Sequence, residues 1–157
     1  MKKQIVGVLV CVVFLLSITS CTVFEDKAIA SLGEYEKEEF FTSGGVQDYT
    51  DYAKYYYTSV DFENNTYFKK VKETDFTAIN THLDDFENWI ESIRNSVPSN
   101  EVVVNYDFDR GIVDTEDYFY IDSEEHTWED GITAFVRYNV YLFDTQTQVL
   151  YYFHNNI

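Results

Sequence analysis

The feature that most constrains the fold of this chain is a change in hydrophobic period near residue 100. Between residues 74 and 94, apolar residues recur at steps of three and four, which places them along one stripe of a helix. From residue 101 onward, apolar residues instead alternate with polar ones, as they do along a half-buried strand. A helical segment followed by several strands is typical of an α+β domain.

The helical segment predicts one long amphipathic helix. Thr74 is a suitable N-cap, Asp75 would lie in the first turn, and Pro98 limits the C-terminal end. About 20 residues at 1.5 Å per residue give a rod of roughly 30 Å, enough to cross a small sheet. The apolar stripe consists of Phe76, Ile79, Leu83, Phe86, Trp89, Ile90 and Ile93.

Four strands are predicted after the helix, at 102–108, 118–122, 132–144 and 148–154, the last two forming a hairpin around residues 145–147. In the longer hairpin arm, the even positions from Ala134 to Leu142 share one face and the odd positions share the other, so one face should contact the helix. Tyrosine spacing at 46–57 predicts a short preceding helix. The expected fold is a helix on an antiparallel meander, which would fit a cystatin-like or NTF2-like curled sheet.

The N-terminus has the parts of an export signal. Lys2 and Lys3 precede an apolar run from Ile5 to Ile18, and small residues follow it. The run ends in Ile18-Thr19-Ser20-Cys21, which resembles the lipobox of bacterial lipoproteins. This resemblance implies that diacylglycerol is attached to Cys21, that residues 1–20 are removed, and that lipid anchors the protein to the outer face of the bacterial cytoplasmic membrane. In a cell with two membranes, the anchor would lie in the outer membrane.

Two other interpretations of this segment stay open. An uncleaved transmembrane helix is disfavoured, because the apolar run of about 14 residues is shorter than the roughly 20 that span a bilayer. An ordinary secretory signal would leave the Cys21 thiol free. Cys11 is a poorer lipidation site, since bulky Val10 precedes it. If Cys11 leaves with the signal and Cys21 carries lipid, the mature chain contains no cysteine pair for a disulfide.

The remaining chain divides into a tether and one domain. Residues 21–45 contain the lipidated cysteine and an acidic run, and end in a Thr-Ser-Gly-Gly break. We expect this segment to be a solvated tether, although Phe40 and Phe41 could pack on the domain. Residues 46–157 should form a single α+β domain, because aromatic residues make up 18% of the chain, far more than a disordered chain contains.

The charge of the mature chain excludes one class of partner. Removing Lys2 and Lys3 leaves 9 basic residues against 28 acidic ones, a formal charge of −19. Nucleic acid is therefore not an expected partner, because phosphate contacts need a basic surface. Such an acidic domain would also be repelled from lying flat on an anionic membrane.

Residues 105–116 match part of the ligand pattern of a calcium-binding loop. Asn105, Asp107, Asp109 and Glu116 match positions 1, 3, 5 and 12 of a calcium-binding loop. However, Arg110 stands where that loop needs glycine. The competing interpretation is an acidic strand edge that prevents strand pairing with other chains. Calcium is the sole cofactor that the sequence suggests.

A second acidic cluster covers residues 122–130 and is predicted to be a loop between strands. Trp128 could stack on a sugar that the carboxylates hydrogen-bond, or the acidic side chains could hold a cation with His126. The favoured alternative is a solvated connection whose tryptophan folds back on the sheet. The candidate ligand-binding residues are Glu124, Glu125, His126 and Trp128.

Catalytic motifs are not found. The three histidines have no metal-ligand spacing, and the mature chain lacks a phosphate-binding glycine loop and a nucleophile elbow. We therefore expect a non-enzymatic binding or interaction module whose partner is an envelope protein or a glycan. A module for divalent cations or glycans is the alternative, and an envelope hydrolase is the least favoured hypothesis.

Overall fold

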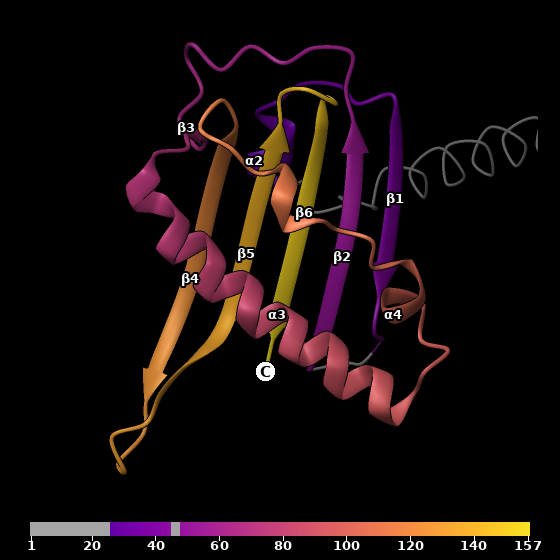
Figure 1. The fold of residues 1–157 in the computed structure, drawn as a ribbon, viewed down its shortest axis with the longest axis vertical. Coiled ribbons are helices and arrows are strands. Elements are labelled where there is room, and N and C mark those ends of the chain that lie inside the picture. The colour runs from indigo at the N-terminus through magenta and orange to yellow at the C-terminus, as the bar shows by residue number, and fades with distance from the viewer. Residues whose placement is uncertain (1–25, 45–47) are drawn as a thin grey trace, which may run out of the picture.

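The computed structural model describes residues 26–44 and 48–157, and these residues form an α+β fold with one antiparallel sheet (Figure 1). The α+β prediction is confirmed, but the sheet has six strands rather than about four. Their order across the sheet is β1-β2-β6-β5-β4-β3. The strands are β1 (Lys37–Thr42), β2 (Tyr49–Tyr56), β3 (Lys69–Lys70), β4 (Tyr118–Thr127), β5 (Thr133–Asp144) and β6 (Val149–Asn156).

The predicted long helix is present as α3 (Phe76–Ser96), which follows a 3-10 turn at Glu73–Asp75 and runs diagonally across one face of the sheet (Figure 1). Its apolar stripe is buried against that face at Ile79, Leu83, Phe86 and Ile90. Thr74 does not act as the expected N-cap. The Asp75 carboxylate instead accepts a hydrogen bond from the backbone N–H of Lys72, 3.0 Å away, before the helix begins.

The β5–β6 hairpin also forms as predicted. Tyr138, Val140 and Leu142 of β5 pack in the core beneath α3, while Tyr141 and Phe143 pack on the opposite face. The alternation breaks further back along β5, where Glu124 pairs with Arg137 but Glu125 pairs with Phe135. This bulge shifts the register by one residue and so reverses the faces, because side chains alternate with a period of two. Phe135 consequently stacks on His82 of α3, with ring centroids 4.3 Å apart.

The helix predicted at 46–57 is wrong, since residues 49–56 form β2. β2 lies between β1 and β6, and the four residues from Thr50 to Ala53 are all buried. A strand covered on both faces loses the alternation of apolar and polar residues that identifies strands. Its tyrosines happen to recur at helical spacing.

The strand predicted at 102–108 is also wrong. Residues 101–105 form the short helix α4 (Glu101–Asn105), whose N-cap Asn100 accepts a hydrogen bond from the backbone N–H of Val102, 3.0 Å away. Val102 is fully buried, whereas Val104 is 66% exposed. The cap and this one buried valine outweigh the strand preference of three consecutive valines.

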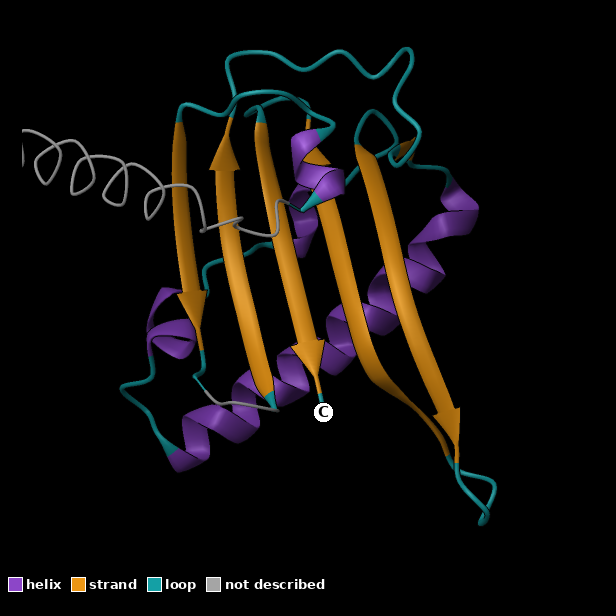
Figure 2. Ribbon diagram, turned by 180° about the vertical axis from the view of Figure 1, so that it is seen from behind, coloured by secondary structure: helices purple, strands orange, loops and turns teal. Residues whose placement is uncertain are grey.

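The prediction of a solvated tether at residues 21–45 is wrong for most of residues 26–44, the part that the structure describes. The four-residue helix α2 (Lys27–Ala30) lies on the sheet face opposite α3, and β1 pairs with β2 along its whole length (Figure 2). Ala28, Ile29 and Leu32 are buried there in a second core with Tyr141 and Phe143. Charged side chains such as those of β1 are common on edge strands, because they discourage pairing with other chains. Residues 21–25 lie outside the described residues.

We predict that Asp117→Ala lowers the free energy of unfolding by about 2 kcal/mol, because buried backbone donors would lose their acceptor. The Asp117 carboxylate is buried and accepts hydrogen bonds from the backbone N–H groups of Asp114 and Thr145, each 2.9 Å away. These bonds tie the start of β4 to the β5–β6 turn. The control is Glu116→Gln, which breaks an exposed ion pair with Lys70 and should cost less than about 0.5 kcal/mol. Urea unfolding of both variants measures the difference, and equal midpoints would contradict it.

Candidate functional site

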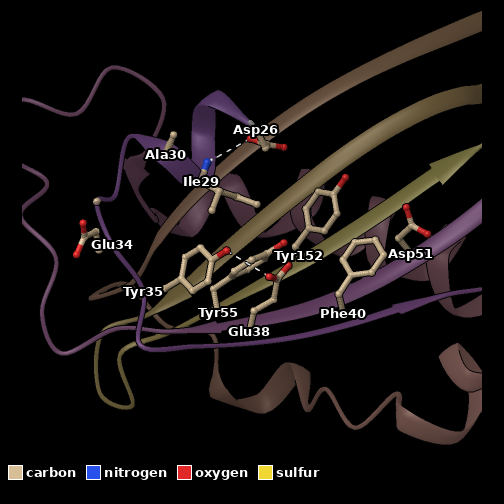
Figure 3. A pocket seen from close by; sticks show the side chains of 11 residues that line it. Asp26, Ile29, Ala30, Glu34, Tyr35, Glu38, Phe40, Asp51, Tyr55 and Tyr152 are labelled. Atoms are coloured by element: carbon tan, nitrogen blue, oxygen red, sulfur yellow. Dashed lines mark hydrogen bonds between the residues drawn. The ribbon is translucent and has the colours of Figure 1, made fainter. Parts of the chain in front are cut away.

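An open hollow of about 800 Å³ lies on the sheet face opposite α3 (Figure 3). The helix α2 and the segment that joins it to β1 form one wall, and strands β1, β2 and β6 form the rest. The volume lies within the range of about 300 to 1,000 Å³ that small-molecule sites occupy. The lining residues are Asp26, Ile29, Ala30, Gly33, Glu34, Tyr35, Glu38, Phe40, Asp51, Tyr55 and Tyr152.

Aromatic rings supply much of the apolar surface of this hollow. Tyr35 packs edge-to-face on Tyr55, with ring centroids 5.1 Å apart, and its hydroxyl donates to Glu38 at 3.2 Å. Tyr152 packs against the buried Tyr141 ring, also at 5.1 Å. Tyr35 and Phe40 remain 42% and 46% exposed. Exposed rings on a concave surface are typical of ligand sites, since a folded chain otherwise tends to bury them.

Asp26 positions α2 over the sheet. One carboxylate oxygen accepts the backbone N–H groups of Ala28 and Ile29, at 2.9 and 3.2 Å, and so caps the helix. The other oxygen accepts the Tyr141 hydroxyl at 2.5 Å. The wall of the hollow is therefore fastened to the middle of β5 through one carboxylate.

Asp51 is the lining carboxylate with an unusual environment. Its side chain is on the buried part of β2 and the residue is only 6% exposed. One of its oxygens, Oδ1, is buried without a hydrogen-bond partner among the described residues. Burial raises the pKa of the Asp51 carboxyl above its ordinary value, while contact with the Thr42 side chain acts in the opposite direction. A buried carboxylate oxygen without a hydrogen-bond partner destabilises a fold, so its presence in a hollow points to a functional role.

His154 lies beside Asp51, directly opposite it on the neighbouring strand β6. Its Nδ1 is 2.7 Å from Oδ1 of Asn139, an acceptor, so the ring proton is placed on Nδ1. Burial lowers the pKa of His154, which keeps the ring neutral at pH 7. His154 therefore provides no positive charge next to Asp51.

We predict that Tyr141→Phe loosens α2 at a cost of about 1.5 kcal/mol, since a hydrogen bond to a charged group contributes about that much. The amides of Ala28 and Ile29 should exchange with solvent faster in the variant, because their Asp26 cap loses its support. Tyr120→Phe is the matched control, because it removes the hydroxyl of the adjacent stacked ring without removing a bond to Asp26. Hydrogen exchange followed by NMR measures the effect, and unchanged rates in Tyr141→Phe would contradict the assigned role of this bond.

The predicted calcium ligands are not brought together. The Asp107 carboxylate accepts the Tyr52 hydroxyl at 2.7 Å and pairs with Lys54 at 2.8 Å, while Glu116 pairs with Lys70 at 2.8 Å. Asp109 accepts the N–H of Gly111, and the amide nitrogen of Asn105 donates to the carbonyl of Glu101. Within residues 26–44 and 48–157, no group of three potential metal ligands is found. Calcium binding itself stays a prediction.

The second predicted site occupies the β4–β5 hairpin, which projects past the rest of the sheet (Figure 2). Residues 122–127 belong to β4, so the predicted loop is wrong and is reduced to the tight turn at 128–132. Glu124, Glu125 and His126 are exposed, and His126 packs edge-to-face on Trp128 with ring centroids 4.7 Å apart. Trp128 is 45% exposed, although its ring contacts His126 of β4. Glycan or cation binding by this hairpin stays a prediction.

Sequence reasoning missed the hollow because its residues lay in segments assigned to other structures. Most of its wall comes from the expected tether, and Asp51 comes from the expected helix. The available signal was the presence of Tyr35 and Phe40 in an otherwise acidic run. Aromatic rings are not expected in a fully solvated tether, so they indicate that this segment packs on the domain.

Comparison of the chain with protein-family models, with curated proteins and with solved structures finds no match. In the part of the chain that the structure describes, no helix is both long enough and apolar enough to cross a membrane. The two features that bear on function are therefore the N-terminal motif and the hollow.

Proposed function

We propose that this chain is a lipid-anchored extracytoplasmic binding module and that the hollow on the sheet face opposite α3 is its binding site. The observation that carries the proposal is the hollow itself, which combines exposed aromatic rings with carboxylates. The lipobox resemblance at Cys21 supports the location, on the outer face of the cytoplasmic membrane or on the outer membrane of a two-membrane cell. Two acyl chains would hold the protein stably at that surface.

The anchor would hold the hollow close to the membrane. Asp26 borders the hollow, and five residue steps separate it from Cys21. A fully extended chain spans at most about 3.6 Å per residue, so the lipidated residue would lie within roughly 18 Å of Asp26. The proposed module therefore samples ligands near the membrane surface rather than at the end of a long tether.

A binding role is favoured over catalysis because the lining residues of the hollow include no histidine, lysine, cysteine or serine beside its carboxylates and tyrosine hydroxyls. The absence of enzymatic activity stays a prediction. Membership of a cystatin-like or NTF2-like fold is also proposed only, and is supported by the single long helix across one antiparallel sheet.

The proposal is tested by mapping ligand contacts on the mature domain. A fragment mixture that contains aromatic and aliphatic amines, alcohols and acids is titrated into ¹⁵N- and ¹³C-labelled protein. Perturbed resonances should cluster at Tyr35, Phe40, Tyr55 and Tyr152, because these rings line the hollow. Resonances of Trp128 serve as the internal control for adventitious aromatic contacts. Perturbations confined to Trp128, or spread evenly over the surface, would contradict the proposed site.

A further inference from the structure

The hollow contains more negative charge than its own residues neutralise. Its lining includes four carboxylates, and none of its eleven lining residues is a lysine, arginine or histidine. Asp26 is satisfied by the helix cap and by Tyr141, and Glu38 accepts the Tyr35 hydroxyl. Asp51 differs because its Oδ1 is buried and accepts no hydrogen bond among the described residues.

The row of side chains that contains Asp51 offers it no positive charge. The row of side chains that crosses the sheet through Asp51 continues to Thr42 on β1 and to His154, Asn139 and Asp122 on β6, β5 and β4. Of these, only His154 could carry a positive charge, and burial keeps it neutral. A ligand can supply this missing positive charge, because a cation in the hollow would pair with the Asp51 carboxylate, whose residue is only 6% exposed.

The remaining walls fit the body of such a ligand. Ring faces attract ammonium and guanidinium groups, and Tyr35, Tyr55 and Phe40 lie around the same hollow as Asp51 (Figure 3). Ile29 and Ala30 of α2 add aliphatic surface on the opposite wall, which suits a hydrocarbon stem.

We propose that the hollow binds an organic cation, an ammonium or guanidinium group on an apolar stem, with Asp51 as its charge partner. This inference deepens the proposed function and depends on it. The same chemistry is present in free polyamines and in basic side chains of peptides, and the experiment below separates these two sources.

The test compares three probes of the same size that differ in charge: 4-phenylbutylamine, 4-phenylbutanol and 4-phenylbutyrate. Each is titrated at pH 7 into the mature domain, and dissociation constants are obtained from the resonances of Tyr55 and Phe40. We expect the amine to bind at least 10-fold more tightly than the alcohol, and the carboxylate to bind most weakly. Spermidine and tri-lysine are titrated in parallel as the free-amine and peptide sources.

Two isosteric variants identify the responsible charge. Asp51→Asn should weaken binding of the amine at least 10-fold and binding of the alcohol less than 2-fold. Asp122→Asn removes the same charge from the same row of the sheet but outside the hollow, so amine binding should change less than 2-fold. Because Asp51 is buried with an unpaired oxygen, its replacement by asparagine should leave the fold intact, which the NMR spectrum checks directly.

The outcomes separate this inference from the proposed function. Equal affinity for all three probes at the hollow would overturn cation selectivity but leave the binding site standing. Equal loss in both variants would show a general charge effect and would also overturn the inference. If no cationic probe perturbs the hollow at 10 mM, the inference is wrong, and the fragment titration decides separately whether the hollow binds anything. Tighter binding of spermidine or of tri-lysine supports the inference and identifies the source.

Discussion

Replacing Phe86 with alanine is expected to lower the free energy of unfolding by about 3 to 5 kcal/mol, because it removes a fully buried ring from the centre of the core. Phe86 contacts Phe153 of β6 and Tyr106, with ring centroids 5.3 and 5.6 Å apart. It therefore joins the long helix to the sheet and to the segment after α4. Since domains of this size unfold with about 5 to 15 kcal/mol, the variant should be close to the limit of stability.

Urea and thermal unfolding measure this effect, and the melting temperature should fall by at least 10 °C. Phe40→Ala is the matched control, because it removes the same ring from a position that is 46% exposed in the hollow. Its cost should be below about 1 kcal/mol. Equal destabilisation by the two substitutions would contradict the assignment of Phe86 to the core and of Phe40 to an open surface.

Replacing Cys21 with serine is expected to abolish lipid attachment, because serine lacks the thiol to which the lipobox resemblance assigns the diacylglycerol. Cells that express the chain are grown with an alkyne-tagged palmitate, and label on the purified protein is quantified. The unmodified chain should incorporate label and have lost residues 1–20 by mass. Cys21→Ser should reduce the label at least 10-fold and block this cleavage.

Cys11→Ser is the control for Cys21, since it removes the other cysteine of the N-terminal segment. It should leave both label and cleavage unchanged. Label that persists in Cys21→Ser, or disappears in Cys11→Ser, would contradict the assigned lipidation site. An unlabelled chain that is cleaved after export would instead indicate an ordinary secretory signal.

The sequence predicted α3 because this helix buries one face, and so its apolar residues recur at the helical period. β5 is buried on both faces over its second half, and it was predicted from its length and its many β-branched and aromatic residues. The bulge opposite Glu124 and Glu125 could not be predicted, because a one-residue register shift leaves the composition of β5 unchanged.

The elements that sequence reasoning missed lack a clear period of apolar residues. β2 is covered on both faces and shows no alternation, whereas β1 and the end of β4 lie at sheet edges and contain many charged residues. The same reason explains the missed hollow, which is formed by a charged edge strand, a four-residue helix and a two-sided strand. The chemistry of the hollow depends on tertiary structure, which buries Asp51 and leaves its Oδ1 without a hydrogen-bond partner. No local sequence pattern encodes this environment.

The most direct test of a membrane-anchored module with a ligand-binding hollow uses single-cysteine reporters, because the proposed mature chain otherwise contains only Cys21. Ala30→Cys places a thiol in the hollow, and Ala134→Cys places one on the exposed part of β5. In spheroplasts with an intact cytoplasmic membrane, both thiols should react with an impermeant maleimide. 4-Phenylbutylamine should slow the reaction of Ala30→Cys at least 5-fold and leave Ala134→Cys unchanged. Reaction only after lysis, or equal rates for Ala30→Cys with and without the amine, would contradict the account.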